Sequence, residues 1–360
     1  MVGRVLVPCA DLHDMLAFCT ETLGLRVDRI SPADDPREVD LTGGGLSLRL
    51  VREPQSSGAG IGLELDATLE LRPGTLVAPN GTTVRVVERT RRRELPPLVE
   101  ELVVTRADAG GGFGTGRAGM GYRDLIPSRL GGRFIASHIR IEDGGPVPDY
   151  VHFHRIRFQL IYCRRGWVEV VYEDQGPPFV MEPGDCVIQP PEIRHRVLAS
   201  SPGLEVVEVG CPAEHDTFAD HDLQLPTGRH LPERDYQGQR FVRHVAKDAP
   251  WTPGRLPGWQ SCPVGVEAAT DGLAEIRTLR PEPGGPTHNT SPMWTHGGEL
   301  AFFFVLDGTL DLDLADRIEP LAEGDSVTVP SGVAHRWLRP SEDCRLLEVT
   351  LPADAAWSAS

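Results

Sequence analysis

Three histidines and a glutamine near the middle of the chain have the chemistry of metal ligands. His152 and His154 stand one residue apart in "DYVHFHRIRFQLIYC", and Gln159 follows five residues later. Side chains at i and i+2 of a strand share a face, so the two histidines are expected to be neighbours. Gln159 has the opposite parity. The chain must therefore bend or turn between His154 and Gln159 if all three side chains are to meet.

A further candidate ligand comes from a separate segment. The stretch "GDCVIQPPEIRH" predicts a turn, an apolar strand and a Pro-rich turn that delivers His195. Three imidazoles and one amide oxygen inside a small barrel suit a divalent transition metal, with positions left open for water or substrate. The alternative is a polar barrel interior in which hydrogen bonds satisfy the histidines, because unsatisfied buried imidazoles are costly.

The elements that must position these residues are short strands. From residue 122 onward the chain alternates such strands with Gly/Pro turns, which indicates β-sandwich or barrel domains. The pattern also repeats after about 140 residues: segments 140–146, 158–170 and 181–195 recur in the same order as 280–286, 300–312 and 321–335. Two copies in one order predict two similar domains.

Both motifs resemble those of the cupin family, whose patterns are G(X)5HXH(X)3–4E(X)6G and G(X)5PXG(X)2H. The matching positions here are His152, His154, Gln159 and Gly166 in the first motif, and Gly184, Pro190 and His195 in the second. Gln159 replaces the usual glutamate, and Glu192 stands where the second motif has glycine. The resemblance implies a mainly β chain with two tandem cupin (double-stranded β-helix, or jelly-roll) barrels, and a metal bound by His152, His154, Gln159 and His195.

The substitution of Gln159 for glutamate changes the charge of the predicted site. Neutral ligands leave a divalent ion its full charge, which makes it a stronger Lewis acid. We expect Fe(II), with Zn, Ni or Mn as alternatives. The resemblance favours an Fe(II)-dependent dioxygenase acting on a small oxygen-rich or carbonyl-containing metabolite. A redox-neutral isomerase, cyclase or lyase is the second hypothesis, and a non-catalytic small-molecule-binding cupin is the third.

The second copy keeps fewer of the predicted ligands. Aligning Gly308 with Gly166 places His296 on His154 and His335 on His195. Trp294 and Ala301 replace His152 and Gln159. Glu299 or His288 would have to complete a second metal site, so the second barrel is expected to be degenerate and the first to be active.

Three residues near the ligands are candidates for catalysis. His138 lies on a predicted strand, "RFIASHIRI", and Tyr162 and Arg157 flank the ligands. Simple alternation points Arg157 away from His154, so it is a candidate for the mouth of the site. Histidines with polar neighbours, such as His215, are expected at the surface.

Residues 1–95 predict a small α+β segment, with Asp11 capping a helix. "VPCADLHDMLAFCTETLGLRV" and "APNGTTVRVVE" resemble parts of a glyoxalase/bleomycin-resistance (vicinal oxygen chelate) module. Arg4 stands where metal-binding members carry histidine, which leaves Glu88 as the remaining ligand-like residue and favours a scaffold or dimerisation role. The predicted domains are then a Gly-rich linker at 96–121, the first barrel at 122–235 and the second at 236–360.

Composition limits the partners. The net charge of −16 argues against nucleic acid and anionic membrane surfaces, which need clustered Lys and Arg. No apolar run approaches the length of a membrane span, and we expect a cytoplasmic protein. The scattered cysteines predict reduced, mostly buried thiols. The expected partners are a small-molecule substrate and a second copy in a homodimer.

Overall fold

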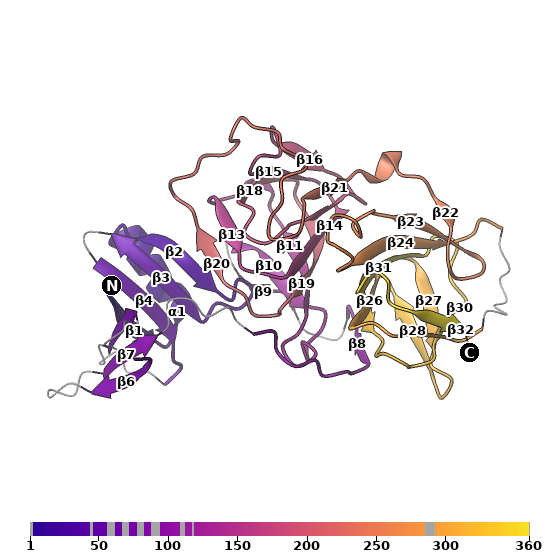
Figure 1. The fold of residues 1–360 in the computed structure, drawn as a ribbon, viewed down its shortest axis with the longest axis horizontal. Coiled ribbons are helices and arrows are strands. Elements are labelled where there is room, and N and C mark those ends of the chain that lie inside the picture. Colours follow the sequence, from indigo (N-terminus) through magenta and orange to yellow (C-terminus); the bar gives the residue numbers. More distant parts are fainter. Residues whose placement is uncertain are drawn as a thin grey trace.

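The protein is mainly β and has three parts that follow one another along the chain (Figure 1). The structure, a computed structural model, describes residues 3–43, 46–55, 62–66, 72–77, 83–87, 94–108, 112–116, 119–284 and 292–359. A small α+β module comes first, and two β-barrels follow it. The predicted fold class is confirmed. Within the described ranges no helix is both long enough and apolar enough to cross a lipid bilayer.

The N-terminal module begins with β1 (Gly3–Cys9) and α1 (Leu12–Ala17), and its other strands are β2 (Arg26–Ser31), β3 (Glu38–Gly43), β4 (Leu46–Arg52), β5 (Gly62–Asp66), β6 (Gly74–Val77) and β7 (Thr83–Val87). The Asp11 carboxylate caps α1 by accepting the Asp14 N–H at 2.9 Å. A π-helical turn, η1 (Phe18–Thr22), then widens the helix. Because this turn shifts the helical phase, Leu23 is exposed while Cys19 is buried.

The two barrels contain most of the strands. The first barrel holds β10 (Gly121–Asp124), β11 (Ile135–Ile141), β12 (Gly145–Pro146), β13 (His152–His154), β14 (Phe158–Arg165), β15 (Val168–Tyr172), β16 (Phe179–Met181), β17 (Cys186–Ile188), β18 (His195–Ser200), β19 (Leu204–Cys211) and β20 (Thr217–Ala219). The second holds β22 (Thr252–Pro253), β23 (Trp259–Pro263), β24 (Glu275–Pro281), β25 (Trp294–His296), β26 (Leu300–Asp307), β27 (Thr309–Asp313), β28 (Ile318–Ala322), β29 (Ser326–Thr328), β30 (Arg336–Leu338), β31 (Arg345–Leu351) and β32 (Trp357–Ala359).

The internal repeat appears as two seven-stranded sheets with the same strand order. One sheet runs β9-β10-β11-β19-β14-β17-β21 and the other β22-β23-β24-β31-β26-β29-β8, with β8 (Val103–Thr105), β9 (Gly114–Thr115) and β21 (Val242–His244). The repeated glycines Gly166 and Gly308 both have φ near +70°. A Cβ at either one would come within 2.3 Å of a serine Oγ, so both turns require glycine.

Each barrel receives one strand from the segment that precedes the other barrel. β8 lies before the first barrel in sequence but pairs with β29 of the second, with Val104 opposite Val327. β21 lies before the second barrel, followed by the short 3-10 helix η3 (Ala246–Asp248), and pairs with β17 of the first. The segment predicted as a linker, residues 96–121, thus supplies β8 to one barrel and β9 to the other.

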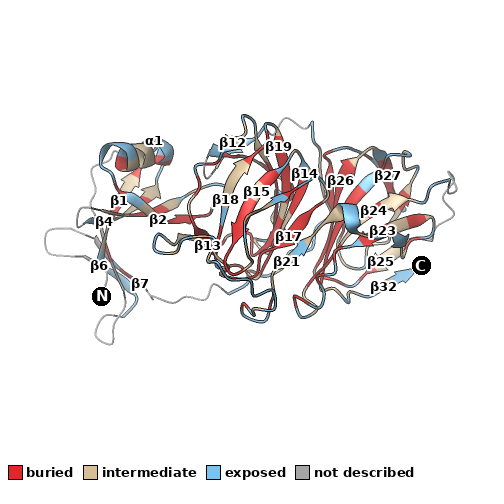
Figure 2. Ribbon diagram, turned by 90° about the horizontal axis from the view of Figure 1, so that it is seen from above, coloured by how far each residue is buried: buried red, intermediate tan, exposed pale blue. Residues whose placement is uncertain are grey.

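The two seven-stranded sheets share one hydrophobic core. Leu160 and Val209 of the first sheet belong to the same buried cluster as Phe302, Phe304 and Val349 of the second. Figure 2 shows the buried segments concentrated in and between the two barrels. The mainly apolar cavity described below lies on the other side of the first sheet, inside its barrel. All seven cysteines are buried and none forms a disulfide, as the sequence predicted.

The N-terminal module is joined to the first barrel by strand pairing. Arg29 and Ile30 of β2 lie opposite Phe218 and Thr217 of β20, and β20 in turn pairs with β13. The sheet of the module therefore continues into the barrel through β20 (Figure 1). Because of this pairing, only β20 separates β2 of the module from β13, the strand that carries His152 and His154.

Candidate metal centre

Three histidines form a compact group inside the first barrel. His152 and His154 lie on β13, and His195 opens β18 directly opposite His152. Their candidate ligand nitrogens all lie within 4.8 Å of one another. All three side chains are at least nine-tenths buried. In the described part of the chain, no other group of three histidine, cysteine or carboxylate side chains is this close.

The outer nitrogen of each ring is held by the protein. His152 Nδ1 contacts the Tyr150 carbonyl at 2.8 Å, and His195 Nδ1 contacts the Ile193 carbonyl at 3.0 Å. His154 Nδ1 lies 2.9 Å from the Thr217 hydroxyl. A carbonyl can only accept, so His152 and His195 carry their proton on Nδ1 and present the lone pair of Nε2. This is the arrangement of metal-ligating histidines.

The turn before His195 explains the departure from the second sequence motif. Glu192 occupies the glycine position and adopts a φ of 63°, close to the 74° of Gly332 at the same place in the second barrel. Its backbone N–H donates to the His154 carbonyl at 3.0 Å, which ties the turn to β13. A non-glycine residue is strained in this conformation by roughly 1 kcal/mol. The turn is preserved despite that cost.

Gln159 reaches the same cavity because the chain changes sheets. Residues 155–157 leave β13, and β14 starts at Phe158 in the seven-stranded sheet. The predicted turn between His154 and Gln159 is therefore present. Gln159 Nε2 donates to Glu208 Oε1 at 2.6 Å, while its Oε1 atom is buried and accepts no hydrogen bond from the described residues. An amide oxygen left in this state, beside three imidazoles, fits a metal ligand.

The four side chains line a cavity of about 100 Å³. Its other walls are mainly apolar, and Ile161, Val170 and Met181 are examples. Polar residues on the wall that the sequence did not predict include Asp34, Tyr172, Gln189, Glu208 and His215. His215, expected at the surface, is buried with its ring centroid 5.3 Å from that of His154. The burial of His215 results from tertiary packing, which cannot be predicted from the polar residues next to it in sequence.

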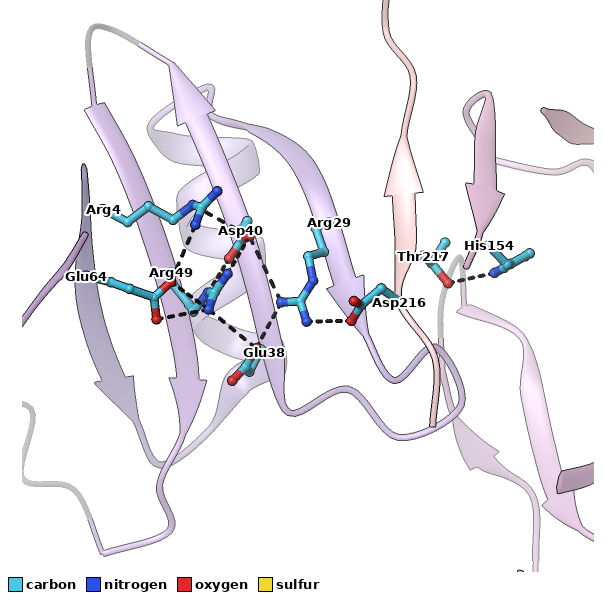
Figure 3. Close-up of polar contacts among 9 residues, drawn as sticks. All are labelled: Arg4, Arg29, Glu38, Asp40, Arg49, Glu64, His154, Asp216 and Thr217. Atoms are coloured by element: carbon cyan, nitrogen blue, oxygen red, sulfur yellow. Dashed lines mark hydrogen bonds and ion pairs between the residues drawn. The ribbon is translucent and has the colours of Figure 1, made fainter. Parts of the chain in front are cut away.

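An ionic network in the N-terminal module ends beside this site (Figure 3). Arg29 Nη2 contacts Asp216 Oδ1 at 2.5 Å, and the next residue, Thr217, holds His154. Behind Arg29, two more arginines that are partly buried form ion pairs with carboxylates of the module; the network consists of Arg4, Glu38, Asp40, Arg49 and Glu64. Arg4 thus takes part in ion pairs at the position where the resembling family carries a ligand histidine. Glu88 lies outside the described residues.

The contact of Thr217 with His154 gives a first prediction. Thr217→Val removes the hydroxyl at nearly constant volume and is expected to raise the Kd of the bound divalent ion by about 10–100-fold, as loss of an outer partner does at other sites. Thr217→Ser keeps the hydroxyl and should retain the wild-type value. A competition titration against a chelating dye measures both. An unchanged Kd in the valine variant would show that the hydroxyl does not orient His154.

The three catalytic candidates lie outside the cavity, at the contact between the barrels. His138 Nε2 lies 3.1 Å from Glu205, and its ring packs against Phe304 of the second barrel. Burial lowers the pKa of His138. Burial alone would raise the pKa of Glu205, but its hydrogen bond with His138 and the charge of Arg164 outweigh this and lower it to about 2.

Tyr162 and Arg157 have the same location. The Tyr162 hydroxyl lies 3.5 Å from Thr278 of the second barrel, and burial raises its pKa. Arg157 forms an ion pair with Glu299 at 3.3 Å. On β14, Gln159 and Ile161 line the cavity, so Tyr162 faces the opposite side. His138, Tyr162 and Arg157 therefore lie at the contact between the two barrels. The tyrosine that lines the cavity is Tyr172.

Among the described residues, the second barrel places His296 and His335 near each other, with ring centroids 6.4 Å apart, but adds no third candidate ligand to them. His296 Nε2 contacts the Val329 carbonyl at 2.8 Å and its Nδ1 accepts the Gly298 N–H, so both nitrogens are used. Glu299 is paired with Arg133 and Arg157 outside the barrel. Burial lowers the pKa of His335 to about 4. His288 lies outside the described residues.

Aromatic residues and one arginine fill the space instead. The remaining cavity is about 10 Å³, barely the volume of one water, and is lined by Trp294, Trp337 and Trp357 among others. The Arg255 guanidinium lies 3.6 Å above the Trp357 ring and is paired with the buried carboxylate of Glu348. Glu348 stands opposite Phe303 as Glu208 stands opposite Ile161, so the two carboxylates are equivalent in the repeat.

Comparisons with known proteins agree with this fold. Residues 280–350 match the family described as "Cupin domain". No curated protein matches the sequence. Among solved structures, the chain is similar to a salicylate 1,2-dioxygenase from Pseudaminobacter salicylatoxidans, with a TM-score of 0.53, 14% identity, and coverage of 74% of this chain and 91% of that one.

The same enzyme in its adducts with gentisate gives a TM-score of 0.52 at 13% identity, covering 75% of this chain and 87% of the other. Identity this low shows a shared fold and nothing about the reaction. The glyoxalase-like character of the N-terminal module has no counterpart in these matches. The family match is confined to residues 280–350 of the second barrel, and the solved structures share the fold of the chain.

Proposed function

We propose that this protein is a metal-dependent cupin enzyme, and specifically an Fe(II)-dependent dioxygenase acting on a small carbonyl-containing or oxygen-rich metabolite. The observation that carries the proposal is the buried group of His152, His154 and His195, whose ligand nitrogens lie within 4.8 Å of one another on the wall of an apolar cavity. Gln159 supplies a fourth, neutral oxygen ligand.

The residues of the chain have separate tasks in this proposal. His152, His154, His195 and Gln159 hold the ion, and the partners of their outer atoms fix their orientation. The ion, when bound, supplies open positions at which O2 and a chelating substrate can bind together. The apolar wall excludes water from the reacting groups. The polar residues Tyr172 and Gln189, joined at 2.8 Å, orient the substrate.

A redox-neutral isomerase, cyclase or lyase is the competing proposal. It is supported by the same neutral ligand set, which leaves the ion a strong Lewis acid that needs no oxidant. The similarity in fold to salicylate 1,2-dioxygenases makes us prefer the oxygen-dependent reaction. That preference is an argument from analogy, and it is open to direct test.

The test is metal analysis of protein purified without added ions, combined with oxygen-electrode measurements. The dioxygenase proposal predicts about one iron per chain and oxygen uptake that depends on an added hydroxy-carbonyl compound. Zinc or nickel at the same stoichiometry, with no uptake after reconstitution with Fe(II), would favour the redox-neutral reaction. A His335→Ala variant serves as the control, because His335 lies in the filled second barrel.

A further inference from the structure

The cavity of the first barrel extends well beyond the proposed metal ligands. Gln159, one of those ligands, lies opposite Gly210 of β19. Ile135 at one end of β11 is opposite the same glycine, whereas Ile141 at the other end is opposite Leu204. Ile135, Ile141 and Leu204 all line the cavity. Because Ile141 lies six positions after Ile135 on one strand, the cavity runs about 20 Å along the barrel, away from the ligands.

The half of the cavity that is farther from the ligands is walled mainly by hydrocarbon. Side chains from several strands and from the segment before β10 line it: Met120, Ile141, Val168, Met181, Leu204 and Val206. All of them except Ile141 are buried members of one hydrophobic cluster, and Ile141 packs against that cluster. Among the described wall residues, the polar exceptions outside the ligand end are Tyr122, which is opposite Ile139, and Asp34, which is ion-paired with Arg129. Such a wall favours apolar groups over hydrated ones.

Met120 and Ile141 stand at the apolar end of the cavity. Both residues also line a second pocket of about 470 Å³, whose wall includes Phe113, Pro146 and Val147. The inner cavity has a volume of only about 100 Å³ along its length of about 20 Å, so its shape suits a slender chain better than a ring system. Met120 is unbranched and can change its rotamer easily, which makes it a suitable stop between the two spaces.

We infer that the substrate carries an unbranched apolar chain that lies along the apolar half of the cavity, and that Met120 sets the longest chain that fits. The inference rests on the proposed function, because the polar head of such a molecule lies beside the proposed metal ligands. Each methylene that enters the apolar half leaves water for a hydrocarbon wall, which favours binding. A strongly hydrated group in place of the chain loses its water in this half of the cavity and is disfavoured.

A homologous series of probes tests the inference. Linear hydroxamic acids, from acetohydroxamic to decanohydroxamic acid, share one metal-binding head and differ only in chain length. Calorimetric titration into the full chain loaded with Zn(II) gives the Kd of each probe. Each added methylene is expected to lower the Kd about threefold to fourfold, the gain for one buried methylene, until the chain reaches Met120 and the Kd levels off. A Kd that does not fall with chain length would overturn the inference.

Two substitutions at Met120 should move the length at which the Kd levels off in opposite directions. Met120→Ala joins the inner cavity to the second pocket and should allow chains longer by about two carbons or more, while the larger side chain of Met120→Phe should shorten the limit. A folding defect cannot produce shifts of opposite sign. Met15→Ala makes the same change at a partly buried methionine of the N-terminal module and should leave the limit unchanged. The same limit in both Met120 variants as in the wild type would show that Met120 does not set the chain length.

Omitting zinc separates this inference from the proposed function. If every probe binds more weakly without zinc by a common factor, and the dependence on chain length is unchanged, both proposals are supported. The same dependence on chain length with Kd values that do not respond to zinc would support the apolar half as a binding site and contradict the metal centre. A strong response to zinc without any dependence on chain length would support the metal centre and overturn the inference.

Discussion

Replacing His152 with alanine is expected to abolish stoichiometric metal binding. The change removes one of three imidazoles whose ligand nitrogens lie within 4.8 Å of one another. Loss of an outer partner alone weakens metal binding by about 10–100-fold at comparable sites, so loss of a direct ligand should raise the Kd by more than about 100-fold. Inductively coupled plasma analysis of the purified variant, followed by competition titration, measures the effect.

The second barrel provides the matched control for this variant. His335→Ala removes a buried histidine from the equivalent position but should leave the metal content unchanged, because His296 uses both of its nitrogens and the cavity there is nearly filled. His195→Ala should behave like His152→Ala. Metal that survives in both first-barrel variants and is lost in His335→Ala would reverse the proposed roles of the two barrels.

Arg255→Met is expected to destabilise the protein by about 3–5 kcal/mol, the usual cost of removing one partner from a buried ion pair. Glu348 is almost completely buried, and the Arg255 guanidinium is both its cation and the group that stacks on Trp357. Methionine fills part of the volume but leaves the carboxylate unpaired. The midpoint of urea unfolding, followed by tryptophan fluorescence, reports the change, since Trp357 contacts the substituted residue.

Two further variants separate burial from charge. Arg345→Met breaks the ion pair between Arg345 and Asp307, whose side chains are about one half and one third exposed, respectively. The substitution should therefore lower the free energy of unfolding by less than about 1 kcal/mol. The double variant Arg255→Met/Glu348→Leu removes both charges and should recover most of the stability. A loss in Arg255→Met no larger than that in Arg345→Met would show that Glu348 does not depend on Arg255.

The candidate ligands could be predicted from the sequence because they depend on the spacing of residues within short segments. Spacing places His152 and His154 on one face of a strand, and the repeat identifies Trp294 and Ala301 as replacements in the second copy. Even the parity of Gln159 was informative, since it required the turn that the structure contains between β13 and β14. The resemblance of the motifs to the cupin family supplied the barrel architecture.

The positions of the other residues around the site could not be predicted, because they depend on contacts between segments that are far apart in the sequence. Tyr162 flanks Gln159 in sequence, but whether it faces the cavity or the other barrel depends on which sheet surface is covered, and the second barrel covers its side. Glu208 lies 49 residues beyond Gln159 and meets it only through the pairing of β14 with β19. Asp34 reaches the cavity because β2 pairs with β20. Such pairings have no local signature.

The exchange of β8 and β21 between the barrels has a consequence for how the protein is made. During synthesis the first barrel emerges before β21, and until residues 242–244 leave the ribosome the edge of β17 has no neighbour on that side. The outer face of its sheet, with Leu160 and Val209, also waits for Phe302 and Phe304. An open edge and a bare apolar face promote aggregation. The second barrel and the segment before it thus cover an edge and an apolar face of the first barrel that would otherwise be exposed to solvent.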